Sequence, residues 1–109
     1  MKRTITKIVA YIVQIAEPDE IILFGSMANG TSNVHSDLDL LIVTAEPAQK
    51  RQIAERVQHF AQELALRADV LVYSEKELKK AYAKADSFLS GIRCSGKIVY
   101  QKGRKCLDF

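Results

Sequence analysis

The spacing of apolar and polar residues divides this 109-residue chain into helices and strands. Apolar residues at helical spacing predict an amphipathic helix over Thr4–Ala16, with Thr4 as its N-cap. A second helix is expected from Pro47 to about Leu66. A third begins with a capping box at residues 74–77 and runs towards Phe88.

Short, continuous apolar runs predict buried strands between these helices. The predicted strands are Glu20–Phe24, Leu38–Val43, Ala68–Tyr73 and Lys97–Tyr100. Since strands alternate with helices, the expected fold class is α/β, with helices packed on a sheet. The helix between the second and third strands is long enough to be a crossover, so these two strands could be parallel.

Two polar motifs flank the first two strands. Residues 24–30 read Phe-Gly-Ser-Met-Ala-Asn-Gly, and residues 36–40 read Ser-Asp-Leu-Asp-Leu. Because side chains alternate along a strand, Asp37 and Asp39 should project to one side, where their charges repel unless a cation lies between them. Magnesium prefers such oxygens, and a Gly-Ser turn before a short helical segment offers donors to an anion. Either motif alone is common, but together they indicate metal-dependent phosphoryl or nucleotidyl transfer.

The order of these motifs resembles the nucleotidyltransferase superfamily that includes DNA polymerase beta. It matches more closely the smallest branch, the minimal nucleotidyltransferases (MNT), whose pattern Gly-Ser-x-Ala-x-Gly, five residues, Ser-Asp-x-Asp-Leu is present in full. The resemblance implies a polymerase beta-like fold with a mixed sheet of about four strands, in which the first two strands are antiparallel. Met27 and Asn29 depart from the family, because many members carry arginine at both positions.

The resemblance also implies the residues of the site. The implied catalytic and metal-binding residues are Asp37, Asp39 and Asp69. The implied nucleotide-binding residues are Gly25, Ser26, Gly30 and Ser36. Asp69 heads the third strand and would bind a second metal ion and act as general base. Gly25 and Ser26 would contact phosphate, Gly30 would close the turn, and Ser36 would orient the acids. The implied substrate is ATP, with two magnesium ions (Mg²⁺) and manganese (Mn²⁺) as the alternative.

We expect the chain to transfer AMP to a hydroxyl on a partner protein. Residues 1–109 should form one domain with a flexible tail from about residue 101, which leaves nothing to wall an acceptor pocket. Minimal nucleotidyltransferases are typically encoded beside a helical HEPN protein, often an RNase toxin. The resemblance therefore implies an antitoxin that AMPylates a HEPN-like partner in a hetero-oligomer. Two alternatives stay open: a module that silences the toxin by contact alone, and a catalytic subunit of a small-molecule, aminoglycoside-type nucleotidyltransferase.

Composition narrows the class of protein further. The net charge is +3, and the lysines are not interleaved with aromatic residues, so we do not expect direct nucleic-acid binding. No apolar run approaches the roughly 20 residues that span a bilayer. The two cysteines carry no disulfide signature, and no export signal is evident, which predicts a cytoplasmic protein.

Overall fold

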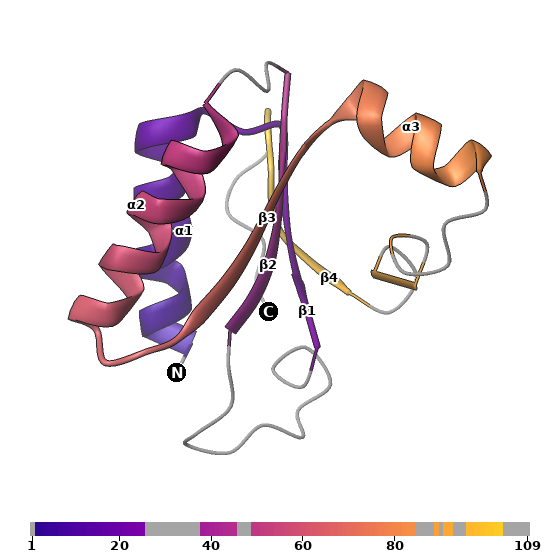
Figure 1. Cartoon of the computed structure of the whole chain (residues 1–109). Helices are drawn as coiled ribbons and strands as arrows, with labels where there is room; N and C mark the ends of the chain where they lie inside the picture. The colour runs from indigo at the N-terminus through magenta and orange to yellow at the C-terminus, as the bar shows by residue number, and fades with distance from the viewer. Residues whose placement is uncertain are drawn as a thin grey trace.

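The computed structural model describes residues 2–25, 38–45, 49–84, 89, 91–92 and 96–103. It contains a sheet with helices on both faces (Figure 1). In chain order the elements are α1 (Lys2–Ala16), β1 (Glu20–Phe24), β2 (Leu38–Thr44), α2 (Lys50–Glu63), β3 (Ala68–Ser74), α3 (Glu75–Ala83) and β4 (Lys97–Gln101). None of the helices in the described part of the chain is long and apolar enough to cross a membrane.

The sheet is mixed, as expected. Its strand order is β3-β2-β1-β4, in which β2 and β3 are parallel and β1 is antiparallel to both β2 and β4. Helix α2 forms the crossover between the two parallel strands and packs against β3. The α/β class, the four strands and the antiparallel pairing of β1 with β2 are therefore confirmed.

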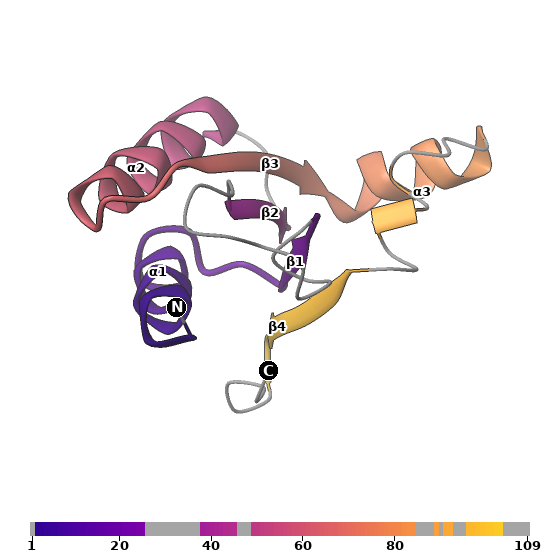
Figure 2. The same ribbon diagram turned by 90° about the horizontal axis from the view of Figure 1, so that it is seen from below.

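Strand β2 is buried on both faces because helices cover both sides of the sheet (Figure 2). Leu38, Leu40 and Ile42 pack in one core with α1 and α2. Leu41 and Val43 pack in a second core on the α3 side. The alternation of side chains places residue 39 on the α3 side, at the end of the strand that α3 does not cover.

The end of α1 at Ala16 is as predicted, but the start of α1 and the end of α2 differ from the predictions. Helix α1 begins at Lys2, so Thr4 lies in its first turn and is not the N-cap. Helix α2 ends at Glu63 and not near Leu66, because Ala65 adopts a left-handed φ of 60°. The N–H groups of Ala65 and Leu66 then donate to the carbonyls of Gln62 and Ala61, which closes the helix.

Two other helix ends were predicted at Phe88 and at Pro47. Helix α3 ends at Ala83, where the N–H of Lys84 donates back to the carbonyl of Lys80. Phe88, towards which this helix was predicted to run, lies outside the described residues. Pro47 also lies outside them, and the described part of α2 begins at Lys50.

The predicted capping box at the start of α3 is confirmed. Ser74 Oγ accepts a hydrogen bond from the Glu77 N–H at 3.1 Å, and Glu77 Oε1 accepts one from the Ser74 N–H at 3.1 Å. Glu77 also forms an ion pair with Lys50, which ties the start of α2 to the start of α3. The hydrogen bond from Lys50, followed by the one from the Ser74 backbone, holds the pKa of Glu77 below its ordinary value.

A Glu77→Gln variant is expected to keep the capping box and lose the ion pair. The pair contributes fully above the unfolded-state pKa of Glu77, and its contribution disappears as the pH falls through the lower, folded-state pKa. Because both side chains are about a third exposed, at 32% and 38%, the contribution is modest. We expect the wild type to exceed the variant in free energy of unfolding by about 0.5–1 kcal/mol at neutral pH, and by nothing in acid. Urea unfolding of both proteins from about pH 7 to about pH 3 measures this, and a difference independent of pH would contradict it.

Candidate active site

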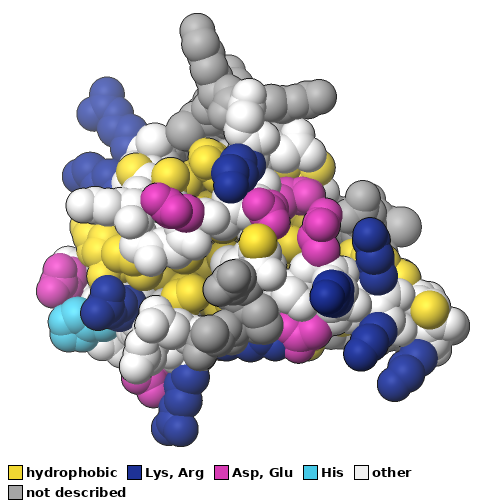
Figure 3. Space-filling view, turned by 90° about the horizontal axis from the view of Figure 1, so that it is seen from above, with side chains coloured by type: hydrophobic (Ala, Val, Ile, Leu, Met, Phe, Trp, Pro, Cys, Tyr) yellow, Lys and Arg dark blue, Asp and Glu magenta, His cyan; other side chains and the backbone are white. Residues whose placement is uncertain are grey.

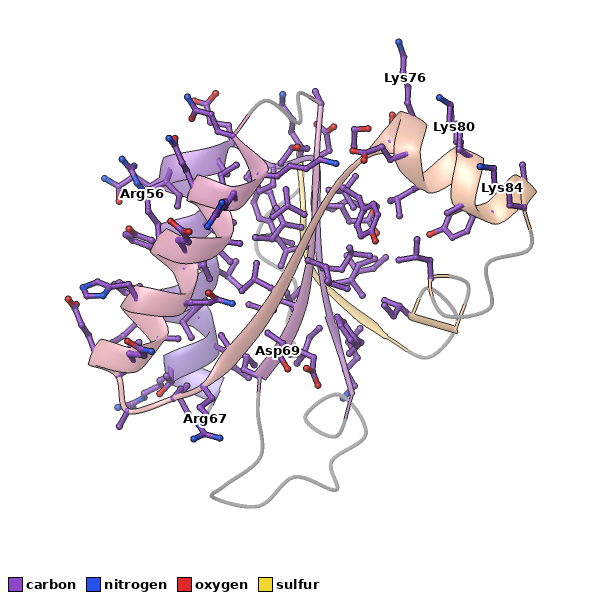
Figure 4. All side chains as sticks on the ribbon, in the orientation of Figure 1. Arg56, Arg67, Asp69, Lys76, Lys80 and Lys84 are labelled. Carbon is purple, nitrogen blue, oxygen red and sulfur yellow. The ribbon has the colours of Figure 1, made fainter. Side chains whose placement is uncertain are left out.

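Three strand ends meet at the open end of the sheet. The register pairs Asp39 of β2 with Phe24 of β1 on one side and with Asp69 of β3 on the other. Residues paired across neighbouring strands face the same way, so the carboxylates of Asp39 and Asp69 lie side by side. The N–H of Leu38 donates to the carbonyl of Arg67 at 2.8 Å, which fixes the start of β2 against the approach to β3. Figure 4 shows Asp69 at this end of the sheet.

These strand ends surround a pocket of about 590 Å³. The lining residues are Phe24, Gly25, Asp39, Gln58, Asp69, Val70 and Leu71. Asp39 is half-buried and Asp69 is exposed, so both carboxylates are accessible from the pocket. The structure therefore brings together three predicted site residues: Gly25, Asp39 and Asp69. The other four, Ser26, Gly30, Ser36 and Asp37, lie outside the described residues.

Only glycine fits at position 25 without strain, for two separate reasons. Its φ is 79°, a left-handed conformation that side chains rarely tolerate. A Cβ at this position would lie 3.1 Å from Asp39 Cγ and closer still to Asp39 Oδ2. The glycine backbone thus passes directly beside the carboxylate, and any larger residue would push the carboxylate away.

The donor set at this end of the sheet fits a hard divalent cation. Among the described residues no group of three or more His, Cys, Asp or Glu side chains could hold a metal ion. Two carboxylates nevertheless lie side by side and open onto space for phosphate oxygens and water, the remaining ligands that magnesium takes. Asp37 is the third acid that the sequence places in this region.

The sequence did not identify a second pocket, of about 300 Å³, that adjoins the first. Its lining residues are Gln58, Gln62, Arg67, Ala68 and Asp69, so the two pockets share Gln58 and Asp69. Gln58 and Gln62 are four residues apart on α2, and Arg67 precedes β3. Helical spacing places the two glutamines on one face, but spacing alone does not distinguish this face from an ordinary solvated one.

Three exposed lysines of α3 lie away from these pockets. Figure 3 views the molecule from the end opposite the site and shows Lys and Arg side chains along the α3 side. Lys76, Lys80 and Lys84 are exposed on α3, and Figure 4 shows them at the other end of the sheet from Asp69. Among the described residues that line the two pockets, Arg67 alone carries a positive charge.

Comparison with solved structures shows where the same fold occurs. A candidate nucleotidyltransferase from Sulfolobus solfataricus superposes with a TM-score of 0.66 at 17% identity, covering 98% of this chain and 86% of the other. A toxin-antitoxin structure with AMP-PNP has a TM-score of 0.61 at 20% identity, covering 89% and 73%. A mutant of the toxin-antitoxin MntA-HpeT, with two Asp→Glu substitutions, has a TM-score of 0.58 at 16% identity, covering 87% and 71%.

The sequence itself places the chain in a family. No curated protein is similar enough in sequence to count as a relative. Residues 3–94, however, match the family model described as a nucleotidyltransferase domain. This match covers most of the chain and agrees with the fold and with the resemblance carried by the Gly-Ser and Asp-x-Asp motifs. The chain therefore belongs to the nucleotidyltransferase domain family.

Proposed function

We propose that this protein transfers AMP from ATP to a hydroxyl group on a partner protein. The observation that carries the proposal is the in-register pair of Asp39 and Asp69, with the Gly25 backbone against the first carboxylate and a pocket in front of both. Family membership gives nucleotidyl transfer as the class of reaction. A structure of the same fold was solved with AMP-PNP, which supports ATP as the donor.

Each residue has a distinct role in this proposal. The turn at Gly25 and Ser26 holds the β- and γ-phosphates through its N–H groups and the serine hydroxyl, while Gly30 and Ser36 shape the turn and orient the acids. Asp37 and Asp39 would hold both magnesium ions, and Asp69 would also hold the catalytic one of the two. Bound magnesium supplies charge stabilisation on the phosphate oxygens.

The proposed reaction is an in-line displacement at the α-phosphorus. The acceptor oxygen forms a bond to phosphorus, its proton passes to the Asp69 carboxylate, and the bond to the β-phosphate oxygen breaks. Pyrophosphate then leaves on the Gly25 side of the pocket. The chain's contribution is mainly to position the reactants and to place charge, so few side chains are needed.

The partner that we propose is a HEPN-like helical toxin, modified on a tyrosine within a hetero-oligomer. Two structures with this fold are toxin-antitoxin structures, and one carries two Asp→Glu substitutions two positions apart, the spacing of Asp37 and Asp39. The fold likeness and the MNT motif pattern support an antitoxin role. The decisive experiment is to incubate the protein with α-phosphate-labelled ATP, magnesium and the product of its neighbouring gene. Label on the neighbour supports the proposal.

Two further measurements, of the toxicity of the neighbour and of the labelling of an added aminoglycoside, give results that would contradict the proposal. Neutralisation of a toxic neighbour without any label would mean that the protein acts by contact alone. Label on an added aminoglycoside, with none on the neighbour, would identify a small-molecule nucleotidyltransferase.

Magnesium is expected to strengthen nucleotide binding through Asp39. A non-hydrolysable ATP analogue should bind about tenfold more tightly with magnesium than with EDTA, because the ion would supply positive charge to the carboxylates that hold it and to the phosphates. Isothermal titration calorimetry of the wild type and of Asp39→Asn measures the effect. Because magnesium also neutralises charge on the free nucleotide, part of the effect does not depend on the protein. The comparison of Asp39→Asn with the wild type isolates the part that depends on Asp39. If Asp39→Asn keeps the full difference, Asp39 does not hold the ion.

A further inference from the structure

The second pocket lies beyond Asp69 as seen from Gly25. Across the sheet the order is Gly25 after β1, Asp39 on β2 and Asp69 on β3, which is the outermost strand. Helix α2 packs against β3, and Gln58 and Gln62 of this helix line the pocket together with Arg67. The pocket adjoins the first one, because Gln58 and Asp69 line both.

The geometry of an in-line reaction places the leaving pyrophosphate and the acceptor hydroxyl on opposite sides of the reacting phosphorus. In phosphoryl transfer the attacking and leaving oxygens lie roughly in line, on opposite sides of the phosphorus. If pyrophosphate leaves towards the turn at Gly25, the acceptor hydroxyl must approach from the side away from Gly25. That side holds Asp69, which takes the proton, and then the second pocket.

The lining of this pocket suits a polypeptide that carries a carboxylate. The amides of Gln58 and Gln62 both donate and accept hydrogen bonds, as peptide groups require. The guanidinium of Arg67 can bind a carboxylate through two parallel hydrogen bonds. Arg67 takes part in none of the ion pairs found among the described residues, although Asp69 lines the same pocket.

A nucleic-acid acceptor fits the same pocket less well. Sites for single-stranded nucleic acid combine several Lys or Arg side chains along the backbone with aromatic rings on which bases stack. The described lining of the second pocket has one cation and no aromatic residue.

Resting on the proposed function, we infer that the pocket formed by Gln58, Gln62 and Arg67 receives the acceptor polypeptide. Arg67 pairs with an acidic side chain next to the acceptor hydroxyl, and the two glutamines bind the peptide backbone. This places the specificity for the partner on the α2–β3 edge, separate from the phosphate turn at Gly25.

The test uses dye-labelled peptides that differ only in charge. A central tyrosine is flanked by glutamates, by glutamines or by lysines, and binding is measured by fluorescence polarisation with and without magnesium and a non-hydrolysable ATP analogue. The wild type is expected to bind the glutamate peptide about tenfold more tightly than the glutamine peptide, an effect typical of a partly shielded charge pair. An Arg67→Glu variant should reverse the preference and favour the lysine peptide.

A matched variant controls for the general change of charge. Arg56 is also exposed on the α2 side, but it lines a different pocket with Tyr11 and His59, and Figure 4 shows it away from Asp69. Arg56→Glu should therefore keep the wild-type preference. Binding of the ATP analogue should be unchanged in both variants.

Several results would overturn the inference, and they differ from failure of the proposed function. Equal or absent binding of the three peptides by the wild type would overturn it, as would Arg67-dependent binding of single-stranded RNA in place of peptide. If Arg67→Glu weakens binding of the ATP analogue as much as it weakens binding of the peptide, Arg67 holds the triphosphate instead. In each of these cases the wild type still binds the analogue with magnesium. If the wild type does not bind the ATP analogue with magnesium, the proposed function itself is wrong.

Discussion

An Asp39→Asn variant is expected to transfer AMP about 10²–10³-fold more slowly than the wild type, the scale seen when one group that stabilises charge in a transition state is removed. Asp39 lies on the middle of the three strands, between the Gly25 turn and Asp69. Asparagine keeps the shape of the side chain but removes the negative charge that a cation needs. The fold should survive, because Asp39 is half-buried at the open end of the sheet and belongs to neither hydrophobic core.

A matched substitution shows whether the loss is specific. Asp19 precedes β1 at the opposite end of the sheet, and its backbone N–H donates to the Val43 carbonyl at 2.7 Å, a bond that asparagine preserves. Asp19→Asn should transfer AMP at the wild-type rate. Initial rates of label incorporation, with circular dichroism as a check of folding, compare the two variants. If Asp39→Asn retains more than about a tenth of the rate, less than 1.4 kcal/mol of barrier is involved, and Asp39 is not a metal ligand.

The strands could be predicted closely because burial on both faces leaves a continuous apolar run. β1 has the predicted bounds, and each of the other strands is one residue longer at its end. The end of α1 at Ala16 and the capping box at the start of α3 were predicted correctly, but other helix ends could not be predicted, because they depend on backbone conformation. The end of α2 is set by Ala65 in a left-handed conformation, where the sequence offers no glycine to mark it. Thr4 has the chemistry of a cap but lies within α1.

The prediction of how the strands pair came from two kinds of evidence. The parallel pairing of β2 and β3 follows from a helical crossover, but the antiparallel pairing of β1 and β2 came from the family resemblance. Once both are known, Asp39 and Asp69 become neighbours although thirty residues separate them in sequence. The Gly-Ser and Asp-x-Asp motifs therefore contain two residues that line the first pocket, Gly25 and Asp39.

The outer part of the site was not accessible from the sequence. Gln58, Gln62 and Arg67 are polar residues on a helix surface and in a turn, which is where solvated residues are found. Only the position of β3 as the outermost strand, with α2 packed on it, shows that they border the same space as Asp69. Tertiary arrangement, and not local pattern, defines this pocket.

A Gly25→Ala variant is expected to lose binding of the ATP analogue, by about 10²-fold or more. The added Cβ would collide with the Asp39 carboxylate, so either the carboxylate or the turn must move. Either movement separates the proposed phosphate-binding backbone from the proposed metal-binding acid, and a displacement of about 1 Å can cost this much in a positioned site. Gly25→Val should have at least the same effect. Calorimetric titration with the analogue and magnesium measures the loss.

Gly103→Ala separates this collision from simple backbone strain. Gly103 has nearly the same φ, 84°, but a Cβ there meets nothing within 4 Å. Both alanine variants should lose about 1–2 kcal/mol of stability, because both force a side chain into a left-handed conformation. Nucleotide binding should be lost in Gly25→Ala alone. If the two variants bind the analogue equally well, contact between the Gly25 backbone and Asp39 has no part in holding the nucleotide, and the phosphates bind elsewhere on the protein.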